Sequence, residues 1–104
     1  MTPKTVTIIV PKLGTTTEEA RELVDHAGSA LAGAVVELDA GESSVHSRTY
    51  VTGLVEALLE HSALRVQVIR APQAFAEHFE RAADPRGLLY EWVDSQRDAA
   101  VAAR

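Results

Sequence analysis

Side chains that could support catalysis or metal binding are few in this sequence and stand far apart. Its four histidines are His26, His46, His61 and His78, and no pair has the close spacing with which two histidines on one helix hold a metal ion. The chain contains no cysteine, so disulfide bonds and thiolate metal sites are excluded. We therefore expect neither a metal nor a cofactor.

One serine has a histidine beside it and an acidic residue a short distance before it. Ser47, His46 and Asp39 can be drawn as a catalytic triad, but adjacent side chains rarely point at one another, and no Gly-x-Ser-x-Gly motif is present. The glycines stand singly, which excludes the phosphate-binding loops of nucleotide sites. We interpret the polar stretch 39–47 as a solvated loop and expect no enzymatic activity.

The same serine stands where a helix should begin. Ser is among the best N-cap residues, and capping alone contributes about 1 kcal/mol. A phosphate on Ser47 would add nearly two negative charges at the positive end of the helix, which tolerates them, and would change the surface that a partner meets. Ser47 is thus either a cap alone or a cap that also serves as a regulatory or contact residue.

The helix that follows Ser47 has an apolar side and a polar side. Val51 and Leu54 belong to the apolar side, which should face the sheet. Arg48, Tyr50 and Thr52 are then expected to project outward, and Tyr and Arg are favoured anchors at protein interfaces.

The elements that must position these residues alternate between strands and helices. Residues 5–10 form an apolar run that predicts a strand buried on both faces, followed by a Thr-capped helix from about residue 15. A turn is expected at 84–87, and residues 88–93 form either an edge strand or the start of a final helix. The remaining predicted elements are strands at 34–38 and 64–69 and helices at 48–61, from Pro72 onward, and at 96–103.

This alternation predicts one α/β domain over residues 1–104, with a mainly parallel four-stranded sheet and intervening helices. The composition, 46% hydrophobic and 24% charged, is typical of a globular domain. Cationic residues are scattered in a chain of net charge −5, so nucleic acid is not expected as a partner. No signal peptide or membrane span is visible, which favours a cytoplasmic location.

Three segments have the order and spacing of a known family: AVVELDAGESSVHSRTYVTGLVEALLE (34–60), LRVQVIRAPQAFAEHFERAA (64–83) and LLYEWVDSQRDAAVAA (88–103). Through them the chain resembles the STAS domain, the fold of bacterial anti-sigma factor antagonists. The first parallels the family's strand, acidic residue, loop and regulatory helix. In that alignment Ser47 occupies the phosphorylated position, whereas His46 replaces an acidic residue and Thr49 replaces the usual glycine.

The resemblance implies a regulatory module that binds a protein, such as a kinase-type anti-sigma factor or another signalling protein. Docking is expected through the loop 39–47 and the helix 48–60. Two alternatives stay open: an interaction protein with the same fold but without phosphoregulation, structural or host-directed, and a sensor of a small ligand. Homodimerisation through Tyr90 and Trp92 is also left open. The predicted contact residues are Ser44, His46, Ser47, Arg48, Tyr50 and Thr52.

Overall fold

A four-stranded parallel sheet forms the base of the fold in a computed structural model that describes residues 4–41 and 45–93. The strands lie side by side in the order in which they occur in the chain, each separated from the next by a helical crossover. They are β1 (Thr5–Ile9), β3 (Val35–Asp39), β5 (Arg65–Ile69) and β6 (Tyr90–Val93). The predicted fold class, a parallel four-stranded α/β sheet, is confirmed.

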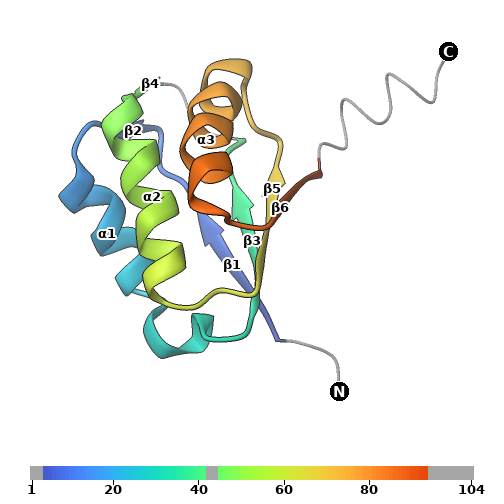
Figure 1. The fold of residues 1–104 in the computed structure, drawn as a ribbon. Coiled ribbons are helices and arrows are strands. Elements are labelled where there is room, and N and C mark those ends of the chain that lie inside the picture. The colour runs from blue at the N-terminus through green and yellow to red at the C-terminus, as the bar shows by residue number, and fades with distance from the viewer. Residues whose placement is uncertain (1–3, 42–44, 94–104) are drawn as a thin grey trace, which may run out of the picture.

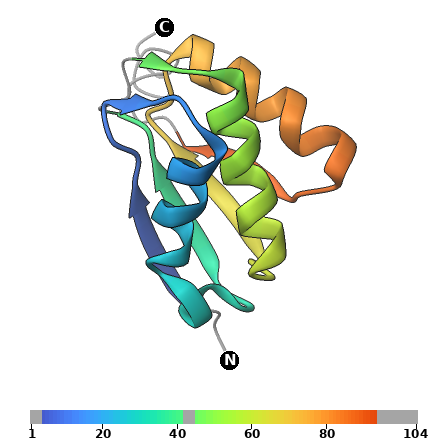
Figure 2. The same cartoon turned by 90° about the vertical axis from the view of Figure 1, so that its left-hand side faces the viewer.

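All of the helices described lie on the same face of this sheet (Figures 1 and 2). They are α1 (Thr17–Asp25), a short 3-10 helix (Gly28–Leu31), α2 (Arg48–Glu60) and α3 (Gln73–Arg86). Successive crossovers of one hand, between strands added in one direction, place every helix on the same side. Helix α2 lies in the middle and packs against both α1 and α3.

No helix of the described ranges covers the opposite face of the sheet, which we call the bare face. This explains why the prediction for the first strand was wrong. Strand β1 was expected to be buried on both faces, but it lies at an edge, and Thr5, Thr7 and Ile9 are exposed. Only the alternate residues Val6 and Ile8 turn toward the helices and the core. The polar row that crosses the bare face is Thr7, Glu37, Gln67 and Glu91.

The helix ends follow local sequence signals. Thr16 caps α1 in a reciprocal capping box with Glu19, as the Thr-Glu pattern predicted. The turn predicted at 84–87 was wrong, because α3 continues through Pro85 and stops at Gly87, whose φ is +73°. Pro85 is tolerated in the last turn, where the left-handed glycine and a bond from the Leu88 N–H to the Ala83 carbonyl close the helix.

The end of the described chain is a strand and not a helix. Strand β6 pairs in parallel with β5, and its Tyr90 and Trp92 rings make edge-to-face contacts with Phe79 of α3, at centroid distances of 5.3 and 6.1 Å. The expected helix at 96–103 lies outside the described residues. No helix within the described ranges combines the length and the apolarity that crossing a bilayer requires.

Candidate functional site

A second, very small sheet holds the start of α2 at the rim where the strands end. Strand β2 (Leu13–Gly14) pairs in parallel with β4 (Val45–His46), and the Ser47 N–H donates to the Gly14 carbonyl at 3.1 Å. Sequence reasoning missed this ladder, because two-residue strands leave no periodic pattern. It ties the segment before α2 to the segment before α1.

The Ser47 side chain forms two hydrogen bonds at this rim. Its Oγ accepts from the Tyr50 N–H at 3.0 Å, which is the N-cap bond that the sequence predicted. The same hydroxyl donates to the Thr15 carbonyl at 2.8 Å. Ser47 is half-buried, so its hydroxyl both caps α2 and joins it to the start of α1.

Tyr50 does not project outward, and this part of the predicted site was wrong. Its side chain is only 1% exposed, and its ring lies so close to Gly14 that a Cβ added to that glycine would approach the ring to 2.5 Å. Burial, with a smaller effect from the negative charge of Glu19, raises the pKa of the phenol to about 12. Tyr50 is therefore a neutral core residue at neutral pH.

The exposed part of α2 is a narrow stripe, which we call the outer strip. It is narrow because α1 and α3 cover both flanks of the helix, so seven of its residues are buried. Along the strip, Arg48 and Thr49 are exposed and Thr52 is half-buried. The members of the outer strip are Arg48, Thr49, Thr52, Glu56 and Glu60.

The C-terminal half of the outer strip is occupied by an ion-pair network that joins three helices. Glu56 lies 4.0 Å from Arg21 of α1 and 3.3 Å from Arg86 of α3, and Glu60 forms a close pair with Arg21. In contrast, the side chains of Thr49 and Thr52 form no hydrogen bond with any residue in the described ranges. The N-terminal half of the strip therefore presents polar groups that no residue in the described ranges satisfies.

Asp39, the acidic residue of the predicted loop, also lies at this rim. Asp39 ends β3 and pairs with Arg70 at 2.6 Å, while it accepts from the Gly41 N–H at 2.9 Å. Burial opposes ionisation of this carboxyl, but the two hydrogen bonds and the Arg70 charge outweigh burial and lower its pKa. The backbone of His46 forms part of β4. The His46 side chain and all of Ser44 are not among the parts of the chain that the structure describes.

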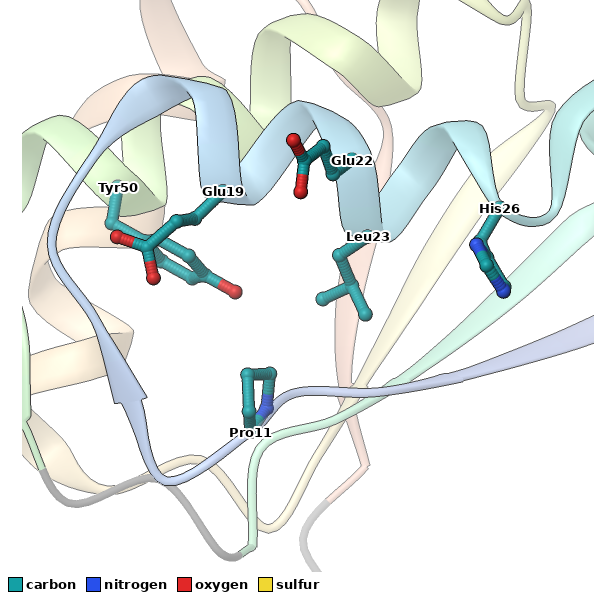
Figure 3. A pocket seen from close by; sticks show the side chains of 6 residues that line it. All are labelled: Pro11, Glu19, Glu22, Leu23, His26 and Tyr50. Carbon is teal, nitrogen blue, oxygen red and sulfur yellow. The ribbon is translucent and has the colours of Figure 1, made fainter.

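A pocket of about 390 Å³ opens beside this rim, between α1 and the segment after β1. Figure 3 shows Glu19 and Tyr50 at one end of the opening and His26 at the other. The carboxylate of Glu19 accepts from the Thr15 and Thr16 hydroxyls, and these bonds lower its pKa. The lining residues are Pro11, Glu19, Glu22, Leu23, His26 and Tyr50.

This pocket supplies hydrogen-bonding groups rather than a nucleophile with a base. Glu19 is held by its capping bonds, and the phenol of Tyr50 stays protonated at neutral pH. Within the described ranges, no group of three or more histidine and acidic side chains is placed to hold a metal ion.

A second pocket, of about 310 Å³, lies between α2 and α3 and is basic. It places Arg48 of α2 near His78, Arg81 and Arg86 of α3. Sequence reasoning singled out Arg48 but missed the three α3 residues. Arg81 and Arg86 follow His78 by three and eight positions, which are spacings of one helix face, and this was the available signal.

No protein-family model, curated protein or solved structure matches this chain. Function is therefore inferred from the residues of the chain itself.

Proposed function

We propose that this chain is a non-enzymatic regulatory module that binds a protein partner, in the manner of an anti-sigma factor antagonist, in the cytoplasm. The partner docks where the loop 39–47 meets the first turns of α2. The resemblance of residues 34–60 to the STAS regulatory segment names the class of partner, a kinase-type anti-sigma factor or another signalling protein.

The observation that carries this proposal is the division of the outer strip into two halves. The C-terminal half is held by the Glu56 and Glu60 ion pairs, so its charges are already matched within the chain. At the N-terminal half, Arg48, Thr49 and Thr52 offer exposed or half-buried polar groups that no described residue satisfies. Arginine on a rigid helix is a favoured interface anchor.

Ser47 favours the version of this function without phosphoregulation. Its hydroxyl is engaged both as the α2 cap and as a donor to the Thr15 carbonyl, so a kinase would have to break two bonds to reach it. An interaction protein with a fixed rim is thus the second candidate function. The two versions share one docking surface and differ only in whether Ser47 is modified.

A matched pair of substitutions tests the docking surface. Thr52→Glu places an acidic side chain on the outer strip, and Thr5→Glu places the same side chain on the bare face of the sheet. Purified wild-type protein and both variants are used as bait with extract of the source cells, and the retained protein is then purified and its affinity is measured directly.

We expect Thr52→Glu to weaken the complex at least tenfold and Thr5→Glu to leave it within twofold of wild type. Equal affinities for the two variants, with both still folded, would place the interface elsewhere and reject the proposed docking surface.

A further inference from the structure

The pocket between α2 and α3 gathers basic residues in an acidic protein. The two helices run side by side on the sheet (Figure 1). The pocket encloses about 310 Å³, and three of the eight arginines of a chain with net charge −5 line it. Its lining residues are Arg48, Thr52, His78, Arg81, Ala82 and Arg86.

Among the residues that the structure describes, a carboxylate pairs with only one of the three guanidinium groups. Arg86 donates to Glu56 at 3.3 Å and to the Ala82 carbonyl at 3.1 Å. Arg48 and Arg81 are exposed, and neither forms an ion pair with a residue in the described ranges. Because like charges repel, a pocket with this excess of positive charge is stabilised by a bound anion.

A further polar group at the pocket also lacks a partner. The Nδ1 atom of His78 is buried, and it has no hydrogen bond within the described part of the chain. Buried polar atoms in folded proteins are nearly always hydrogen-bonded, so one that is not points to an absent partner. The His78 ring lines the same pocket as Arg48 and Arg81.

We propose that this pocket binds a phosphate monoester, presented by a phosphorylated side chain of the protein partner. A guanidinium group holds two phosphate oxygens at once through parallel N–H bonds. A phosphate monoester carries nearly two negative charges at neutral pH and three terminal oxygens, which suits several convergent donors better than a carboxylate does. Arg48 also stands in the first turn of α2, where the helix dipole favours an anion.

That the phosphate belongs to a protein partner rests on the proposed function, because the pocket shares Arg48 and Thr52 with the outer strip. Binding of the phosphate group does not rest on it. The resemblance to the STAS domain implies a phosphate on Ser47 of this chain. Here the phosphate is instead on the partner, and this chain binds it.

The test uses the full chain, labelled for NMR, at constant ionic strength. O-phosphoserine, inorganic phosphate and glutamate are titrated separately into wild-type protein. Arg81→Gln removes a pocket charge without breaking any ion pair in the described ranges. Arg65→Gln, at the start of β5, is the matched control, because Arg65 is also an exposed arginine without such a pair.

We expect O-phosphoserine and inorganic phosphate to cause saturable shifts in the amide signals of residues 48–52 and 78–86, with glutamate at least tenfold weaker. Arg81→Gln should lower the affinity for O-phosphoserine at least tenfold, and the affinity of Arg65→Gln should stay within twofold of wild type. Equal binding of glutamate would overturn the assignment to phosphate. Equal effects of the two substitutions, or the absence of saturable shifts, would overturn the assignment of phosphate binding to this pocket.

The outcome separates this inference from the proposed function. If O-phosphoserine fails to bind while Thr52→Glu still weakens the partner complex, the phosphate pocket is rejected and the docking surface stands. If O-phosphoserine binds as expected while Thr52→Glu and Thr5→Glu affect the complex equally, the pocket stands and the proposed docking surface is rejected.

Discussion

Replacing Ser47 with alanine removes the two hydrogen bonds that the Ser47 hydroxyl forms at the start of α2. The first is the cap bond from the Tyr50 N–H at 3.0 Å, and loss of such a cap costs about 1 kcal/mol. The second is the bond to the Thr15 carbonyl at 2.8 Å, which is near solvent and therefore contributes about 0.5–1 kcal/mol. We expect Ser47→Ala to lower the free energy of unfolding by about 1.5–2 kcal/mol, the sum of these two values.

Urea denaturation monitored by Trp92 fluorescence measures this loss, because the single tryptophan packs against Phe79 in the core. Ser47→Thr keeps a hydroxyl for both bonds and should cost less than about 0.5 kcal/mol. Ser47→Asp keeps only the acceptor and should cost about 0.5–1 kcal/mol, the value of the lost donor bond. A loss below about 0.5 kcal/mol for Ser47→Ala, with an unchanged denaturant slope, would refute the double role of the hydroxyl.

The same aspartate variant separates capping from regulation. If the rim is a phosphorylation-sensitive contact surface, Ser47→Asp weakens the partner complex far more than it weakens folding. The binding constant of the purified complex and the melting temperature of the free protein are compared for wild type and variant. Losses of the same size in both would mean that Ser47 serves only as the α2 cap.

Three further substitutions test the supporting contacts. Gly14→Ala drives a methyl group into the Tyr50 ring, so unfolding free energy should fall by about 1–3 kcal/mol in urea denaturation; an unchanged midpoint would contradict the packing. The pKa of Asp39 is lower in the folded protein than the value of about 3.9 expected in the unfolded chain, so its ionised form stabilises the fold above that pH. This contribution is lost as the pH falls through the folded pKa. Arg70→Gln should therefore reduce the loss of stability below about pH 4, and identical pH profiles would refute the pairing. Glu56→Gln breaks the bridge to Arg21 and Arg86 and should cost about 0.5–1 kcal/mol in dilute buffer and less in 1 M salt. A loss that does not depend on salt would show that the bridge is not electrostatic.

The architecture was predictable because each main element leaves a local pattern. Alternating apolar residues indicated strands such as β5, and the Thr16–Glu19 capping box marked the start of α1. The prediction for β1 was wrong because burial of a strand depends on its place in the sheet. An apolar run such as 5–10 does not indicate whether the strand lies at the edge or in the centre of the sheet. Because the helices lie on one face, every second residue of β1 is exposed.

The site was only partly predictable, because its surfaces form between elements. Ser47 was identified as a cap from residue type and position alone. Tyr50 was misplaced because a helix packed on one face was assumed, whereas α2 is flanked on both sides. Gly14 and Gly53 were the available signals: both make room for close neighbours, the Tyr50 ring in one case and α1 in the other. The approach of Arg48 to Arg81 depends on helix packing, which no local pattern encodes.

The most direct measurement of the central claim is the NMR footprint of the purified partner on this chain. We expect complex formation to broaden or shift the amide signals of residues 45–53, at the start of α2, and to leave those of Thr5–Ile9 on the bare sheet face unchanged. A footprint confined to β1 and the bare face, with residues 45–53 unaffected, would contradict docking at this rim.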